Sequence, residues 1–108
     1  MTEFGNDNDT RYADLHVHTT ASDGSCDPAI VVEKAHATGF AAIAISDHDT
    51  VSGIDEAMIR GAELGVEIIP AVELSAGLEI EELHVLGYFI DHRNQELLNA
   101  LETFRQHR

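Results

Sequence analysis

The sequence has little of what several classes of protein require. It holds a single cysteine, Cys26, so it can form neither an internal disulfide nor a zinc site built from several thiolates. No apolar run approaches the roughly 18 residues of a membrane-spanning helix, and the start, MTEFGNDND, is acidic and polar where a secretory leader is basic and apolar. The single cysteine fits a reducing compartment. We therefore expect a cytoplasmic protein that does not bind a membrane.

Positive charge is also scarce. The chain has 20 Asp or Glu against 6 Lys or Arg, with Lys34 as the one lysine, for a formal net charge of -14. We therefore expect no tight nonspecific binding to a nucleic-acid duplex, which needs clustered basic residues. Self-repulsion of this size destabilises a compact state, and about 1 M salt shortens the Debye length to about 3 Å. The composition predicts a salt-rich, halophilic cytoplasm; the alternative is an ordinary acidic domain.

Length and patterning predict one α/β domain. A chain of 108 residues, 44% of them hydrophobic, suits one folded domain. We expect a flexible acidic lead-in over residues 1–12, followed by short apolar runs that alternate with helical patterns, which is typical of a mostly parallel sheet. The expected strands cover residues 13–18, 40–45, 66–72 and 83–90, with a hairpin turn at Gly77 between the last two. The expected helices begin near residues 28, 52 and 94.

Capping residues mark the ends of the three expected helices. These residues are Asp27, Pro28 and Gly39 for the first helix, Ser52, Asp55 and Gly65 for the second, and Asn94 for the last. The second helix should bury a stripe at helical spacing, Ile54, Ala57, Met58 and Ala62.

Two histidines alternate with apolar residues in the first expected strand. His16 and His18 would point to one face of that strand, about 7 Å apart along it. Two imidazoles so placed can both reach one cation, and burying them without one leaves polar ring nitrogens to satisfy. The alternative is a pair of solvated histidines on a polar face.

A third histidine, His48, follows the second expected strand between Asp47 and Asp49. Ligands collect at this end of parallel strands, and a neighbouring carboxylate can orient a histidine that binds metal. The alternative is a turn in which Asp47 or Asp49 caps the next helix. Both interpretations can hold together.

Three further residues are ambiguous when each is taken alone. Glu73 follows an apolar run and suits a bridge between two cations, but it could be a solvated loop acid. His84, in a hydrophobic strand, is by itself more often a half-buried structural histidine than a ligand. Asp23, before Gly24, is either a turn residue or a further carboxylate ligand. We interpret the remaining histidines as ordinary, namely His36, His92 and His107.

Convergence favours the metal-binding interpretation. Each candidate lies at or just past the C-terminal end of a different expected strand, or in the loop after it, which places them around one mouth of a parallel sheet. Histidines with bridging carboxylates imply two or three divalent cations, and such clusters activate water and neutralise phosphate oxygens.

Four stretches of sequence resemble the PHP family (polymerase and histidinol phosphatase domains), in its order and spacing. The stretches are DLHVHTTASDG at 14–24, ISDHDTVSG at 45–53, IPAVELSA at 69–76 and ELHVLGYFID at 82–91. The resemblance implies that residues 13–108 are a partial PHP domain, the N-terminal half of a distorted barrel of seven β/α units. The later strands of the family, which bring further ligands and basic residues, would lie beyond Arg108.

The resemblance also implies roles for individual residues. His16 and His18 would bind one metal, Asp23 and His48 a second, and His84 a third, with Glu73 bridging metals. Asp14 and Asp47 would support these ligands, and Asp49 would be the catalytic residue that handles protons.

The activity implied is hydrolysis of small phosphomonoesters or phosphodiesters, nucleotides among them. A hydroxide activated by manganese, zinc, iron or magnesium would attack phosphorus at a site of two or three metals. Because the later strands are missing, the alternative is a noncatalytic metal-binding module that associates through an open sheet edge with another copy or with a complementing C-terminal half. Hydrolysis of an amide or lactone is a third interpretation.

Overall fold

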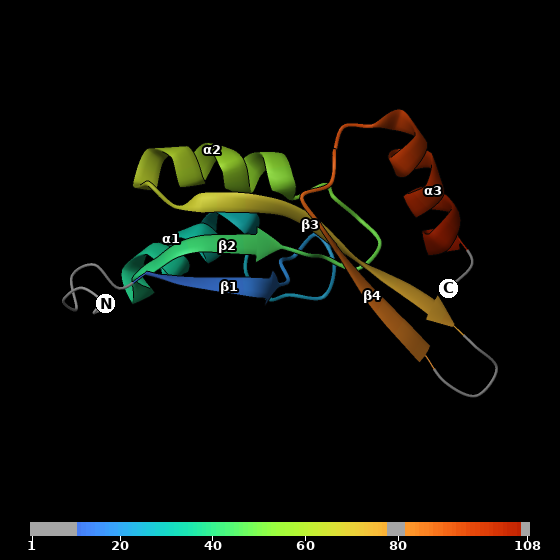
Figure 1. The fold of residues 1–108 in the computed structure, drawn as a ribbon, viewed down its shortest axis with the longest axis horizontal. Coiled ribbons are helices and arrows are strands. Elements are labelled where there is room, and N and C mark those ends of the chain that lie inside the picture. The colour runs from blue at the N-terminus through green and yellow to red at the C-terminus, as the bar shows by residue number, and fades with distance from the viewer. Residues whose placement is uncertain (1–10, 78–81, 107–108) are drawn as a thin grey trace.

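The computed structural model describes residues 11–77 and 82–106, which form one curled four-stranded sheet and three helices (Figure 1). The strands, side by side in chain order, are β1 (Tyr12–Val17), β2 (Phe40–Ile45), β3 (Glu67–Gly77) and β4 (Glu82–Tyr88). The helices are α1 (Pro28–Thr38), α2 (Ile54–Leu64) and α3 (Gln95–Gln106). β1, β2 and β3 are parallel and β4 is antiparallel to β3, so the predicted mostly parallel α/β sheet is confirmed.

β3 changes partner half-way along its length. Its first residues, 67–70, pair with β2, and residues 71–77 pair with β4. The sequence predicted an end at residue 72, but the antiparallel partner supplies hydrogen bonds that carry the strand on to Gly77. The two strands run away from α1 and α2 as a long hairpin (Figure 1). Residues 78–81 between them lie outside the described part of the chain.

The predicted C-terminal glycines of α1 and α2 are confirmed, and Asp27 and Pro28 occupy the N-cap and the first position of α1 as predicted. Gly39 and Gly65 both adopt the left-handed conformation, with φ of 94° and 79°, which glycine tolerates without steric cost. The side chain of Asn94 accepts the N–H of Leu97 at 3.0 Å and so caps α3 as predicted. Asp27 makes no capping bond in α1; its carboxylate instead accepts the hydroxyl of Thr20 at 2.8 Å.

The N-cap of α2 differs from the prediction, because α2 begins at Ile54 and Gly53 occupies the capping position. Ser52 lies one residue earlier, where its hydroxyl accepts a hydrogen bond from Thr50 at 3.2 Å. The predicted capping pair of Ser52 and Asp55 is therefore absent. Asp55 still lies in the first turn of α2, where a negative charge favours the helix dipole.

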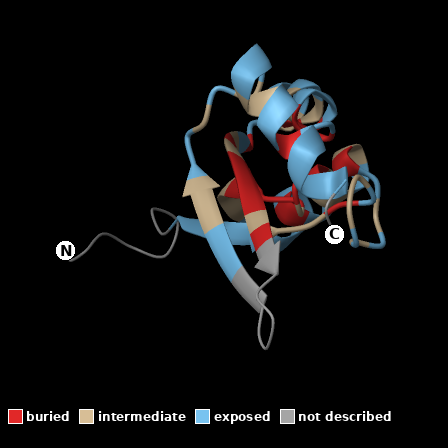
Figure 2. Cartoon of the chain, turned by 90° about the vertical axis from the view of Figure 1, so that its right-hand side faces the viewer, coloured by how far each residue is buried: buried red, intermediate tan, exposed pale blue. Residues whose placement is uncertain are grey.

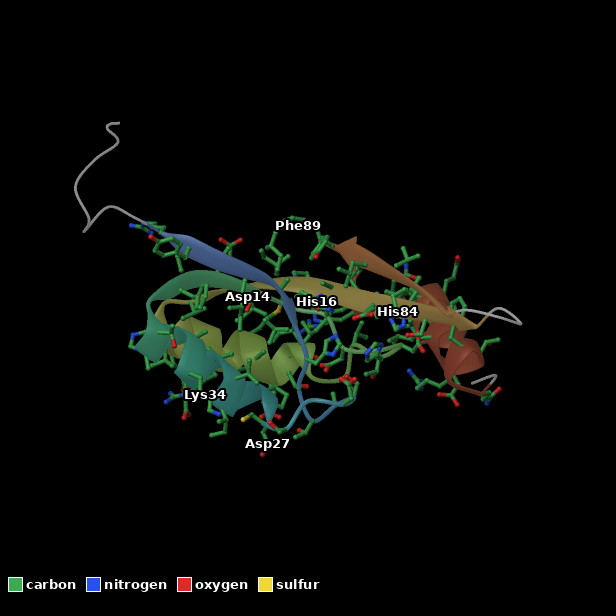
Figure 3. All side chains as sticks on the ribbon, turned by 90° about the horizontal axis from the view of Figure 1, so that it is seen from below. Asp14, His16, Asp27, Lys34, His84 and Phe89 are labelled. Atoms are coloured by element: carbon green, nitrogen blue, oxygen red, sulfur yellow. The ribbon has the colours of Figure 1, made fainter. Side chains whose placement is uncertain are left out.

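The main core lies between the sheet and the inward faces of the helices. Both α1 and α2 pack on one side of the sheet, while α3 stands beside the hairpin (Figures 1 and 3). β3 is largely buried and β4 largely exposed (Figure 2). The predicted α2 stripe is correct at Ile54 and Ala57 but not at Ala62, which is exposed; Gly61 takes the buried position. A Cβ on Gly61 would lie 2.5 Å from the carbonyl oxygen of Val66, so only glycine allows this close approach.

β1 and β4 are the two outer strands of the sheet. Several large apolar side chains along them are exposed, including Leu15 at 49% and Val85 at 47%. The hydroxyl of Tyr88 donates to the carbonyl oxygen of Leu15 at 2.7 Å, which joins the two outer strands and shows how strongly the sheet curls. No helix within the described residues is long and apolar enough to cross a membrane.

Candidate metal centre

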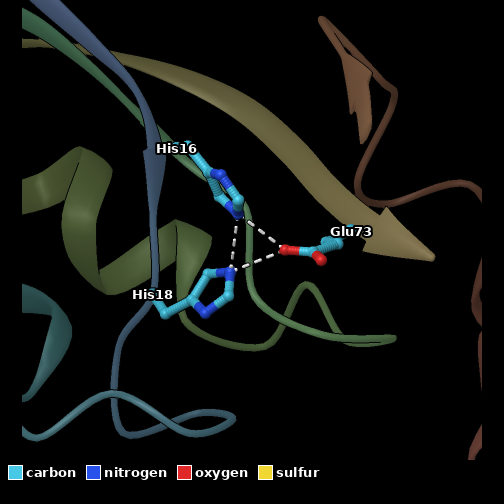
Figure 4. Close-up of side chains that lie close together, drawn as sticks. All are labelled: His16, His18 and Glu73. Carbon is cyan, nitrogen blue, oxygen red and sulfur yellow. Dashed lines mark hydrogen bonds and ion pairs between the residues drawn. The ribbon is translucent and has the colours of Figure 1, made fainter. Parts of the chain in front are cut away.

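His16 of β1, His18 just after that strand, and Glu73 of β3 meet at a single point (Figure 4). Nε2 of His16 and Nε2 of His18 lie 2.7 Å and 2.8 Å from Oε1 of Glu73, and 3.2 Å from each other. Alternation along the β1 segment turns both rings to the same side. Glu73 approaches from β3 across the end of β2, where residues 48 and 73 form a parallel bridge. Three donor atoms therefore converge although more than fifty residues separate Glu73 from the two histidines in sequence.

A second grouping extends from His18 to His48 through Asp23. Nδ1 of His18 lies 2.7 Å from Oδ1 of Asp23, and Nε2 of His48 lies 3.2 Å from Oδ2 of the same carboxylate. His18 thus presents one ring nitrogen to Asp23 and the other to Glu73. One oxygen of Asp23 can orient His18 while the other remains directed at His48.

The third grouping involves the second oxygen of Glu73. Nδ1 of His84 lies 2.5 Å from Oε2 of Glu73, and Nδ1 of His48 lies 3.8 Å from it. The expectation that every candidate sits near the C-terminal end of its strand is wrong for His84. β4 is antiparallel and pairs His84 with Ser75, so the beginning of β4 reaches the site.

Glu73 belongs to the first and the third of these groupings. It is 4% exposed, in contrast with the half-exposed ring of His16. Burial by itself raises the pKa of Glu73, but hydrogen bonds from His16, His84 and His18 outweigh that effect and lower the pKa to about 2. Burial likewise opposes ionisation of the more exposed Asp23, and contacts with His18 and His48 lower its pKa overall. Both carboxylates are therefore anionic at neutral pH.

The donor atoms fit a cluster of divalent cations. Each of the three groupings holds three ligand atoms within 4.8 Å of one another, and neighbouring groupings share His18, His48 or Glu73. Two nitrogens bound tetrahedrally at about 2.0–2.1 Å from zinc lie about 3.4 Å apart, which is close to the 3.2 Å between Nε2 of His16 and Nε2 of His18. Mixed imidazole and carboxylate donors suit zinc, iron and manganese. All six residues predicted as metal ligands lie in this cluster.

Asp47 is hydrogen-bonded to the turn that carries Asp23. Its buried carboxylate accepts the N–H of Thr19 at 2.6 Å, the hydroxyl of Thr19 at 2.8 Å and the hydroxyl of Ser22 at 2.7 Å. These bonds tie the turn that carries Asp23 to the end of β2. Asp14 lies further away, where its exposed carboxylate accepts the N–H of His16 at 3.1 Å.

Asp49 is fully buried, and its Oδ1 accepts the backbone N–H of Ser75 at 3.0 Å. This contact holds β3 against the segment after β2. Asp49 belongs to none of the three ligand groupings among the described residues, and the catalytic role that the resemblance implies for it stays a prediction.

Two residues at the site were not predicted. Ser75, which is 4% exposed, has its hydroxyl oxygen 3.0 Å from Nδ1 of His48. Its spacing of two from Glu73 on a strand was a usable signal, because such residues share a face. Arg105 of α3 reaches back to donate to the carbonyl oxygen of Asp49 at 2.5 Å. No local pattern links positions so far apart in sequence.

An open cavity of about 790 Å³ adjoins the cluster. Asp23, His48 and His84 line it together with Thr50 and Arg105. Pockets of roughly 300–1,000 Å³ accommodate small-molecule ligands, so a compound of nucleotide size can reach Asp23, His48 and His84 from this side.

Comparisons with known proteins agree with this architecture. A 5'-3' exoribonuclease of Haemophilus influenzae is 40% identical over 94 residues, which are 87% of this chain and 34% of that protein. A 3',5'-nucleoside bisphosphate phosphatase of Chromobacterium violaceum is 34% identical over 95 residues, or 88% of this chain and 33% of that protein. A solved structure from Bifidobacterium adolescentis, assigned to the metal-dependent phosphoesterases, superposes with a TM-score of 0.80 at 33% identity over 89% of this chain and 34% of that one.

This chain thus spans about a third of the length of each of these relatives. The resemblance drawn from the four motifs is confirmed, as is the architecture of a partial barrel. The PHP domain matches residues 14–104, which include every side chain of the three ligand groupings. The chain belongs to the PHP family.

Proposed function

We propose that this chain carries the metal centre of a phosphoesterase that hydrolyses small phosphomonoesters or phosphodiesters, nucleotides among them. The observation that carries the proposal is the position of Glu73, whose two carboxylate oxygens face three imidazoles, two from β1 and the residue after it and one from β4. The names of the relatives, an exoribonuclease and a nucleoside bisphosphate phosphatase, support a phosphate ester as substrate.

Each grouping is assigned to one cation position. His16, His18 and Oε1 of Glu73 form the first position, Asp23 and His48 the second, and His84 with Oε2 of Glu73 the third. Two or three manganese, zinc, iron or magnesium ions bound there would lower the pKa of water and neutralise phosphate oxygens. The six ligand residues would hold these ions, and the carboxylates of Asp23 and Glu73 would supply compensating negative charge. We assign proton handling to Asp49, with Asp14 and Asp47 as supports.

The proposal is tested with the full chain, stripped of metal and reloaded with manganese. We expect phosphate release from a panel of nucleotides and simple phosphate esters, and we expect His16→Ala to abolish it by removing a ligand. His36→Ala is the matched control, because His36 is exposed on α1 outside the ligand groupings. A folded, fully metallated chain that is inert on the whole panel would contradict the proposal; amides and lactones in the same panel test that alternative chemistry.

A second candidate function is a noncatalytic module that binds metal and associates with another chain. The exposed apolar residues on the outer strands favour it, because such edges recruit partners. It predicts metal binding without turnover, together with a dimer or a complex with a separately produced C-terminal part of the barrel. Sedimentation measurements beside the substrate panel distinguish the two functions. For either function we expect a cytoplasmic location.

A further inference from the structure

Arg105 lines the same cavity as His48 and His84. It lies in the last turn of α3, and its Nη1 donates to the carbonyl oxygen of Asp49, the residue after His48. α3 therefore brings a fixed positive charge to the ligand cluster from a segment that contributes none of the ligands.

The position of Arg105 in the cavity lining distinguishes it from other arginines of the chain. Arg60 is paired with Glu33 and Glu63, and Arg93 with Asp55, both away from the cavity. Within the described ranges, Arg105 is the arginine or lysine that lines this cavity. A protein with a formal charge of -14 repels anions over most of its surface, so a local cation at the entrance favours an anionic substrate.

The side chain also keeps capacity for a further ligand. A guanidinium carries five N–H donors, and the described contacts are one to the carbonyl oxygen of Asp49 and one from Nη2 to Glu102. Arg105 is 38% exposed, so solvent reaches it. Planar N–H groups match phosphate oxygens in a two-point arrangement.

We propose that Arg105 binds phosphate oxygens of the substrate in this cavity and selects for anionic esters. This inference rests on the phosphoesterase function proposed above. Glu102 then acts as an internal competitor, because its carboxylate occupies Nη2 of Arg105 when no anion is bound. A purely structural role for Arg105, docking α3 on the segment after β2, involves no such competition.

The test measures binding of inorganic phosphate to the manganese-loaded full chain by titration calorimetry. Loss of a charge-assisted contact should weaken binding by about 10- to 100-fold in Arg105→Gln, with manganese stoichiometry unchanged. Arg60→Gln, which removes the same charge outside the cavity, should leave phosphate binding within about twofold. Glu102→Gln should tighten it, because it frees Nη2 without removing the bond to Asp49.

Three outcomes would overturn the inference. They are phosphate binding in Arg105→Gln equal to that of the unaltered chain, a loss that follows manganese release, and no phosphate binding by the manganese-loaded chain. Phosphate binding that depends on Arg105 in a chain without turnover would uphold the inference and count against the phosphoesterase proposal alone.

Discussion

The hydroxyl oxygen of Ser75 lies 3.0 Å from Nδ1 of His48, on the side of the ring away from the contact between Nε2 and Asp23. A proton on Nδ1 that is donated to Ser75 leaves the lone pair of Nε2 directed towards Asp23. Ser75 can therefore set both the orientation and the tautomer of His48, as groups behind metal-binding histidines commonly do.

Replacing Ser75 by alanine should weaken metal binding at the position formed by Asp23 and His48. Loss of such a supporting contact typically lowers metal affinity by about 10- to 100-fold. Manganese titration with calorimetric or spectroscopic detection measures the effect. Ser25→Ala, at an exposed position in the turn after β1, is the control. Equal affinities in Ser75→Ala and the unaltered chain would refute the role of Ser75.

Glu73 should make the metal-free chain sensitive to acid. Its folded pKa of about 2 lies below the ordinary value of 4.5, so its stabilising effect is complete above about pH 4.5 and is lost as pH falls towards 2. The shift corresponds to on the order of 3 kcal/mol in the free energy of unfolding. Urea unfolding between pH 5 and pH 2 should therefore show a steeper decline for the unaltered chain than for Glu73→Gln. Parallel pH profiles would contradict the assignment.

Asp47→Ala should lower the free energy of unfolding even in the metal-free chain. The substitution leaves the buried N–H and hydroxyl of Thr19 without their acceptor, which should cost about 2–4 kcal/mol. Chemical denaturation measures the loss. Asp14→Ala removes an exposed carboxylate nearby and should change the free energy of unfolding by less than about 0.5 kcal/mol. Similar stabilities of the two variants would show that the Asp47 contacts contribute little.

The net charge of -14 should make folding depend on salt. Screening by molar KCl reduces repulsion among the acidic residues, so the melting temperature should rise between low salt and molar KCl. A thermal scan by circular dichroism measures this rise. An unchanged or lower melting temperature in molar KCl would favour an ordinary acidic domain over a salt-adapted one.

The predicted strand and helix positions depended on local patterns, and most of them hold. Gly39 and Gly65 end their helices as predicted, because glycine adopts the left-handed conformation at a helix end without steric cost. The predicted Ser52 cap failed because its hydroxyl found a partner in Thr50 instead. Side-chain hydrogen bonds depend on small differences between nearby partners, which a local pattern does not distinguish.

The ligand cluster was also largely visible in the sequence, since His16, His18 and His48 stand in short motifs beside acidic residues. The expected hairpin turn at Gly77 implied an antiparallel β4, but the register that brings His84 to Oε2 of Glu73 was not visible. Register depends on pairing across the sheet, and a single strand does not determine it.

The amino-acid order alone thus determined which side chains are available for metal chemistry, where the helices end and how negative the chain is, because these properties are local or additive. Only the tertiary structure decided that Ser75 supports His48 and that Arg105 enters the cavity beside the ligands. Those contacts arise from the curl of the sheet and the packing of α3, which depend on many distant residues at once.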